Sequence, residues 1–133
     1  MSFQFSTTVR NAWLDAIESA IGTSVTLEIR SGAAPANCAA ADSGTVLATI
    51  TLPADWMAAA SGGSKALAGT WQDASADATG TAGHFRIKVG ATCHIQGSCS
   101  ATAGGGDMTI DNPALAAGQQ FNVTGFTLTA SGA

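Results

Sequence analysis

Apolar and basic residues alternate strictly over residues 84–89. One face of the extended chain is apolar and the other basic: Phe85, Ile87 and Val89 against His84, Arg86 and Lys88. A period of two predicts a β-strand with one buried face. The basic face holds three of the seven Lys, Arg and His residues, so we expect it to meet water or a docked partner. This strand is the predicted centre of the fold.

A period of about four residues marks the segment 6–22. Apolar side chains form one stripe, made of Val9, Trp13, Ile17 and Ile21. Polar side chains take the opposite side: Arg10, Asn11, Asp15, Glu18 and Ser19. The hydroxyl groups of residues 6–8 suit a helix N-cap, and Gly22 suits the residue after a helix. We predict a helix whose apolar stripe faces the core and whose polar side faces water.

Further alternating segments predict strands, at 24–30, 45–52, 64–71, 93–98, 107–111 and 119–129. Residues 31–44 form a loop, and residues 54–60 after Pro53 predict a short helix. The last strand changes parity at Gly125, which indicates a β-bulge. About seven strands and these two helices predict a single domain, residues 1–133. Its expected fold is mainly β, an antiparallel β-sandwich or jelly-roll-like barrel with one N-terminal α-helix and one short helix.

Charge is scarce in this chain. Charged residues make up 11% of it, against about 25% in an average soluble domain. The low charge favours either a surface packed against other subunits or a small, rigid extracellular-type β domain. The net charge of −4 and the lack of a basic run argue against a nucleic-acid partner. We expect no membrane partner, because no apolar run nears the roughly 18 residues that cross a bilayer. The N-terminal residues lack signal-peptide features, so synthesis in a cytoplasm is expected.

Cysteine and histidine positions match no metal motif. Cys38, Cys93 and Cys99 are expected to be free thiols, although a Cys93–Cys99 bridge stays open. The spacing of His84, His94 and the cysteines fits no zinc site, so the histidines are interpreted as solvated on the outer face of a hairpin. Asp107, Asp111 and Asn112 beside residues 104–106 are interpreted as turn residues, because the calcium-loop pattern fails. We expect no cofactor.

Catalytic motifs of the common nucleophilic and zinc-dependent hydrolases are absent from the sequence. Paired carboxylates cannot be judged from sequence, but most of the nine acidic residues fall in loops or in the helix. The chain is therefore not expected to be an enzyme. Trp56, Met57 and Trp71 are either core residues or an apolar contact surface for a neighbouring subunit.

A set of segments that covers nearly the whole chain carries a family resemblance: 5–7 through Arg10-Asn11, the Ala-Ile-Gly ending at Gly22, 32–36, 44–52, 80–87, and 117–119 leading to 126–129. Together these segments resemble a family of small tailed-phage virion structural proteins, of the head decoration or cement type. These motifs are structural rather than catalytic.

The resemblance implies a capsid decoration or cement protein on the head exterior of a virion. Its expected partners are the major capsid protein and further copies of itself, as a homo-dimer or homo-trimer. The expected contact elements are the arm 1–5 and the loop 31–44, with these interface residues: Phe3, Phe5, Pro35, Asn37, Trp56, Met57, Trp71, His84 and Arg86. The alternative is a tail, fibre or baseplate component with host-surface or glycan binding. A third class is a carbohydrate-binding or hydrolytic module.

Overall fold

A computed structural model describes residues 3–133. These residues form one helix, α1 (Thr7–Ile21), followed by nine strands. These are β1 (Thr26–Ser31), β2 (Val46–Thr51), β3 (Ser64–Ala66), β4 (Gln72–Asp73), β5 (Gly80–Val89), β6 (Thr92–Ala101), β7 (Met108–Ile110), β8 (Ala114–Leu115) and β9 (Phe121–Thr129). The expected mainly β fold with an N-terminal helix is confirmed.

The strands form one curled sheet, a half-barrel, in the order β2-β1-β5-β6-β7-β9-β3. β4 pairs with β9 and β8 pairs with β5 off this path. The pairs are antiparallel except for β6 and β7, which run parallel. β5 lies between β1 and β6 in the sheet and pairs with both.

The concave side of the sheet encloses the core. Four aromatic rings form a continuous row through the core. Their centroid separations are 6.2 Å (Trp56–Trp71), 5.7 Å (Trp71–Phe126) and 5.4 Å (Phe126–Phe85). Ile87 and the inward residues of β1 pack around them and are fully buried. Trp56, Met57 and Trp71 are 0–1% exposed, so of the two interpretations the core role is confirmed and they are not surface contact residues.

The β-bulge expected in the last strand is present. Thr109 pairs with Gly125 and Ile110 with Val123, so Thr124 is the additional residue. Val123 and Phe126 therefore both reach the core despite their odd spacing.

The prediction of a short helix at 54–60 is wrong, because none of these residues is helical. The backbone of this segment is hydrogen-bonded to the end of β3 and the residues after it. Ala58 N–H donates to the Ala66 carbonyl, and the Trp56 carbonyl accepts from Ala68 N–H. Met57 N–H and Ala60 N–H donate instead to carboxylates of α1. Backbone groups used in these ways are not available to an i→i−4 ladder.

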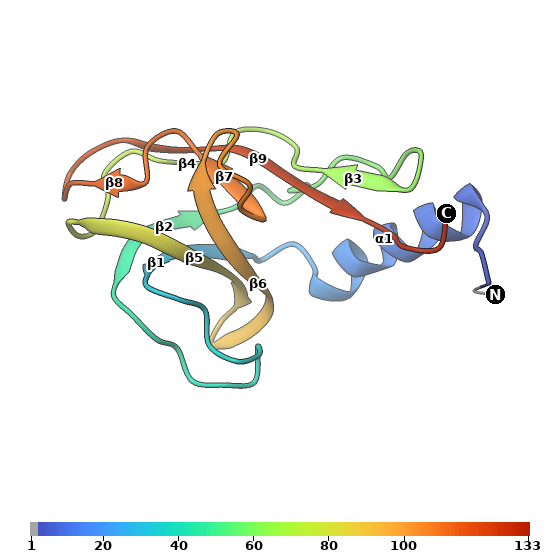
Figure 1. The fold of residues 1–133 in the computed structure, drawn as a ribbon, viewed down its shortest axis with the longest axis horizontal. Coiled ribbons are helices and arrows are strands. Elements are labelled where there is room, and N and C mark those ends of the chain that lie inside the picture. Colours follow the sequence, from blue (N-terminus) through green and yellow to red (C-terminus); the bar gives the residue numbers. More distant parts are fainter. Residues whose placement is uncertain (1–2) are drawn as a thin grey trace.

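Helix α1 begins and ends where the sequence predicts. The Ser6 hydroxyl accepts from Val9 N–H at 3.2 Å, and Gly22 leaves the helix at a φ of 95°. The helix lies at one end of the molecule, beside β3 and the C-terminal residues (Figure 1).

The orientation of α1 reverses the prediction. The polar side faces the protein, and the Lys65 ammonium of β3, 2% exposed, contacts Asp15 at 2.6 Å and Glu18 at 2.9 Å. Asn11 accepts from Gly63 N–H at 2.9 Å. Of the helix residues only Leu14 is fully buried. Burial lowers the pKa of Lys65, but the hydrogen bonds to Asp15 and Glu18 outweigh it and raise the pKa above its ordinary value.

We predict that Lys65→Met detaches α1 from β3, because two carboxylates then face an apolar side chain with no counter-charge. Removing one member of a buried ion pair is destabilising, so the unfolding free energy should fall, by less than for a fully buried pair because the Asp15 side chain is half-exposed. Urea unfolding followed by helical circular dichroism measures the loss. Arg10→Met is the matched control, since Arg10 has no ion pair within residues 3–133. Equal stability of the two variants contradicts the prediction.

Candidate interaction surface

Residues 32–45 cover the basic face of β5 and form the first unusual feature of the molecule. His84, Arg86 and Lys88 are 0%, 2% and 6% exposed, so the expectation that they meet water or a partner protein is wrong. The chain's own loop 32–45 covers this face and lies beside the sheet in Figure 1. His84 and Arg86 are consequently unavailable as interface residues on the outside of this subunit.

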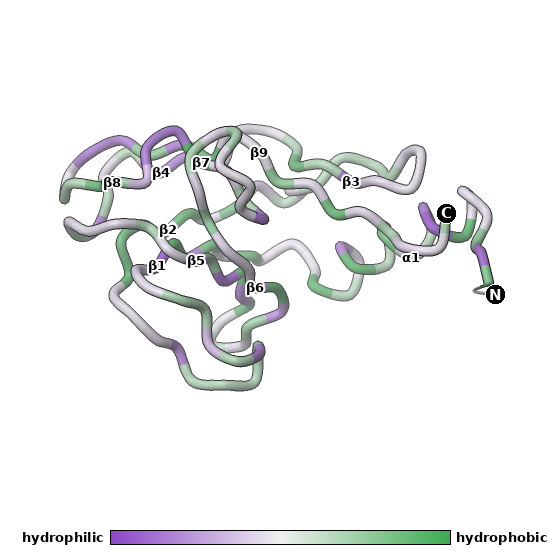
Figure 2. The backbone as a smooth tube through the Cα atoms, in the orientation of Figure 1, coloured by the Kyte–Doolittle hydropathy of each residue, from purple (hydrophilic) through white to green (hydrophobic). Residues whose placement is uncertain are grey.

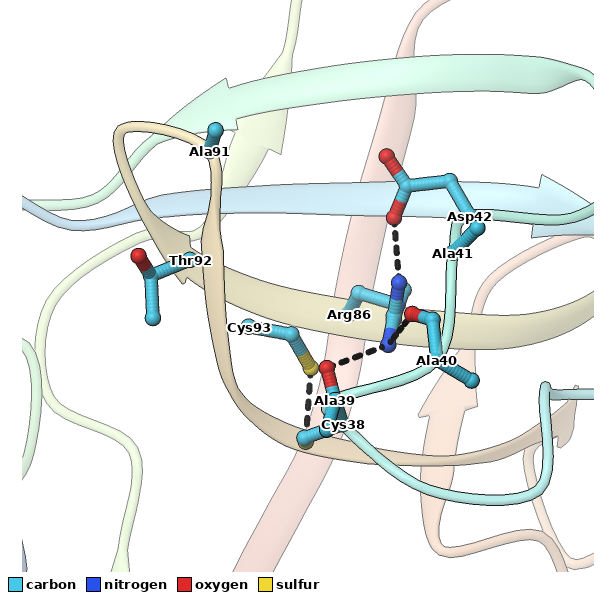
Figure 3. Close-up of a pocket in the computed structure, with 9 residues that line it drawn as sticks. All are labelled: Cys38, Ala39, Ala40, Ala41, Asp42, Arg86, Ala91, Thr92 and Cys93. Atoms are coloured by element: carbon cyan, nitrogen blue, oxygen red, sulfur yellow. Dashed lines mark hydrogen bonds and ion pairs between the residues drawn. The ribbon is translucent and has the colours of Figure 1, made fainter.

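Asp42 of this loop is the shared counter-ion of a charge cluster that contains Arg30, Arg86 and Lys88. Its carboxylate contacts Arg86, lies 2.8 Å from the Lys88 ammonium and 3.3 Å from Arg30 (Figure 3 shows the Arg86 pair). Glu28 of β1 pairs with Arg30 at 2.9 Å and with Lys88 at 3.3 Å. Three cations thus share two carboxylates.

The same ions fix the backbone of the loop. The Arg86 guanidinium donates to the carbonyls of Asn37 (3.2 Å), Cys38 (3.0 Å) and Ala40 (3.2 Å). Gln96 of β6 donates to the Pro35 carbonyl at 2.7 Å. Pro35 is half-buried and Asn37 is exposed, so of the expected loop contacts Asn37 is accessible from outside.

The start of the loop passes so close to β5 that position 83 of this strand requires glycine. A Cβ on Gly83 would overlap the backbone carbonyl of Gly32, and the imidazole Nδ1 of His84 lies 2.9 Å from that same oxygen. His94 is exposed in β6, whereas His84 pairs with Ser98, so the two histidines do not share a solvated outer face.

The second unusual feature is an exposed apolar surface at the helix end of the molecule. Within residues 3–133, the large exposed hydrophobic side chains all gather here: Phe3 (79% exposed), Phe5 (38%), Val9 (49%) and Trp13 (46%). We call this set the N-terminal apolar surface. It contains the first half of the helix stripe that the sequence assigned to the core, because the polar side of α1 has taken the inward position.

The N-terminal apolar surface is continuous. The ring of Phe5 lies edge-on to Phe3 at 5.5 Å and to Trp13 at 6.1 Å, and Val9 stands one helical turn before Trp13. Phe5 N–H donates to the Gly132 carbonyl at 2.7 Å, and the Gln4 amide donates to Ala133 at 3.1 Å. The arm is thereby held in place before any partner arrives, which lowers the entropy cost of binding. Met1 and Ser2, the rest of the predicted arm, lie outside the described residues.

Most cations of the described chain are already paired. Four of the five Lys and Arg residues are engaged with Asp15, Glu18, Glu28 and Asp42, which leaves Arg10 as the one unpaired cation within residues 3–133. The acidic residues outside these pairs are Asp55, Asp73, Asp77, Asp107 and Asp111. Hydrophilic segments gather around β4 and β8, at the end away from α1 (Figure 2). The exposed large hydrophobic side chains of residues 3–133 therefore lie at the helix end, beside the ion pairs of Lys65 with Asp15 and Glu18.

Within residues 3–133, no group of three His, Cys, Asp or Glu side chains lies close enough together to hold a metal ion. Asp107 accepts from Ser98, and Asp111 accepts from Asn122, as turn and strand-end residues do. Within the same residues, no helix has the length and apolar character needed to span a bilayer.

Sequence reasoning missed Asp42 and Cys38, which the structure places at the centre of the covered face. Only the surplus of basic side chains on one strand hinted that an acidic partner had to come from elsewhere. Comparison of the chain with protein-family models, curated proteins and solved structures gave no match.

We predict that Asp42→Asn lowers the free energy of unfolding by about 2–3 kcal/mol, because three cations then share one carboxylate. The partial exposure of Asp42 keeps the loss below that of a fully buried pair. Tryptophan fluorescence during urea unfolding measures it. Asp55→Asn, an exposed carboxylate without an ion pair in the described chain, is the control and should change stability by less than about 0.5 kcal/mol. A loss no greater than that of the control contradicts the cluster's role.

The same cluster predicts an acid-dependent stability. The hydrogen bond from Lys88, followed by that from Arg86, lowers the pKa of Asp42 from 3.8 to about 2 against the opposing effect of burial. A carboxylate with a lowered folded-state pKa stabilises the fold above pH 3.8, and this contribution is lost as the pH falls toward 2. The stability difference between the wild type and Asp42→Asn should therefore be constant above about pH 5 and shrink steadily between pH 4 and pH 2. A difference that stays constant down to pH 2 contradicts the assigned pKa.

Proposed function

We propose that this chain is a structural subunit of a tailed-phage virion, a capsid decoration or cement protein that binds the head exterior. The N-terminal apolar surface is the contact with the major capsid protein. The observation that carries this proposal is the gathering of the large exposed hydrophobic side chains on one helix end whose polar side is already docked inward. Exposed apolar patches of this kind mark interaction sites, and Trp is enriched at the energetic centres of interfaces.

The chemistry of the surface fits a protein that works by packing. Burial of Phe3, Phe5, Val9 and Trp13 against an apolar groove of the major capsid protein supplies the driving force for binding. None of these four side chains carries a charge that would need a new partner in the interface. Four side chains are fewer than the roughly 20–30 residues per side of a stable pairwise interface. A subunit that acts as a homo-dimer or homo-trimer on a repeating lattice compensates by avidity. The exposed loop residue Asn37 is available as an additional contact.

Binding to capsid shells tests the proposal. Shells assembled from the major capsid protein of the same phage are sedimented with the purified chain, and the bound fraction is titrated. We predict that the double variant Phe5→Ser, Trp13→Ser weakens binding at least about thirtyfold, because truncation of an interface anchor costs about 2 kcal/mol or more. Its unfolding free energy is measured beside its binding, because Phe5 and Trp13 are 38% and 46% exposed and also contact each other, and the binding loss should exceed any loss of folded protein.

His94→Ser is the matched control, an exposed ring on β6 outside the N-terminal apolar surface. It should bind shells as the wild type does. Full binding by the double variant rejects the proposed contact surface. Failure of the wild type to bind shells, together with recovery of the chain from separated tails rather than heads, rejects decoration and supports the tail, fibre or baseplate alternative.

A further inference from the structure

Two of the three cysteines meet where the loop 32–45 lies against the sheet. Cys38 belongs to this loop and Cys93 to β6, 55 residues further on, and their sulfur atoms are in contact at 2.6 Å (Figure 3). Both side chains are free thiols, as the sequence predicts. The pairing differs from the Cys93–Cys99 alternative, because Cys99 lies further along β6 and packs against the core beside Met108.

A bulge in β6 aims Cys93 at the loop. Ile87 pairs with Ile95, and the next pair is Lys88 with Cys93, so His94 is the additional residue. Regular pairing would place His94 opposite Lys88 on the face that the loop covers. The bulge puts the thiol there instead and turns His94 out to solvent.

Interactions other than sulfur chemistry hold the two thiols together. Arg86 donates to the Cys38 carbonyl at 3.0 Å and is itself anchored by Asp42. β6 is paired with β5 along its length on the other side. The two segments are therefore held with their sulfur atoms in contact before any covalent link forms.

The pair is accessible to small molecules. A cavity of about 380 Å³ is lined by Cys38, Cys93, Asp42, Arg86 and Thr92, and both cysteines are half-buried. Cys99 is not among the residues that line this cavity, and burial raises the pKa of its thiol to about 12.

We propose that Cys38 and Cys93 form an intramolecular disulfide when the chain moves from a reducing to an oxidising environment, and that this bond locks the loop 32–45 over the basic face of β5. The inference goes beyond the proposed function and holds for any function of the chain. Cytoplasmic thiols are kept reduced, whereas disulfides persist outside cells, so the same chain is unlinked during synthesis and linked after release.

The oxidant is a small disulfide such as oxidised glutathione. One cysteine loses its proton, and its thiolate attacks a glutathione sulfur, breaking the glutathione disulfide and releasing one glutathione thiolate. The second cysteine then loses its proton and attacks the resulting mixed disulfide at the protein sulfur, releasing the second glutathione. The two protein thiols give up two electrons, and one glutathione disulfide becomes two thiols.

The local environment sets the pace of this reaction. Burial, followed by the hydrogen bond with Cys38, raises the pKa of Cys93 to about 11, although the neighbouring Arg86 acts in the opposite direction. Thiolate is scarce at neutral pH, so the rate of linkage should rise up to about tenfold per pH unit between pH 7 and pH 9.

Mass mapping of the full-length chain tests the proposal. The folded wild type is incubated with oxidised glutathione at pH 8, free thiols are alkylated, and the chain is digested with trypsin. We expect alkylation at Cys99 and a disulfide between the tryptic peptides 31–65 and 89–133. The variant Cys99→Ala removes the alternative partner and should still link these peptides, with no alkylated thiol left. Alkylated Cys38 in both proteins after complete oxidation, or a Cys93–Cys99 bond in the wild type, overturns the proposal.

Thermal unfolding tests the locking role. Oxidation should raise the Tm of Cys99→Ala by roughly 5–15 °C, because the bond closes a loop of more than fifty residues in the unfolded chain. Cys38→Ser, treated identically, is the control and should show no such rise. A bond that forms without raising the Tm rejects the lock.

Discussion

Pairing of buried cations is the constraint on which the rest of this structure depends. The chain has five Lys and Arg residues, and four of them are buried and neutralised by carboxylates from distant parts of the sequence. A buried charge without a partner costs several kcal/mol, so the segments that carry the carboxylates must lie where the cations are. Asp42 brings the loop 32–45 onto β5, and Asp15 with Glu18 brings α1 onto β3.

These two pairings determine which surfaces remain outside. Because α1 is anchored by its polar side, the first half of its apolar stripe is left in solvent together with Phe3 and Phe5. Because β5 is covered on both faces, its basic residues are removed from the outer surface. Four of the five Lys and Arg side chains are thus used in ion pairs within the subunit, and exposed apolar side chains remain at the helix end. A subunit arranged in this way suits assembly with neighbours better than free diffusion.

Local patterns predicted much of the fold. The ends of α1, the existence of strand β5, the inward residues of β7 and the bulge beside Gly125 all follow from short-range sequence features, and the structure confirms them. The errors share one physical origin. Periodicity reports which side chains lie on the same face, but it does not report which partner covers that face, and here the partners Asp42 and Arg86 are 44 residues apart. The helix expected at 54–60 failed for a similar reason, since its backbone donors bond to Glu18 and Asp15.

In the function that we propose, the exposed apolar side of α1 is the contact by which this subunit joins a larger assembly. A cryo-electron microscopy reconstruction of the virion that carries the chain tests this contact directly, through the number of copies and the surroundings of Trp13. We expect many copies in icosahedral positions on the shell, with Trp13 and Phe5 buried against the major capsid protein. Copies on the shell whose Trp13 faces solvent would contradict the claim, and so would the absence of the chain from the particle.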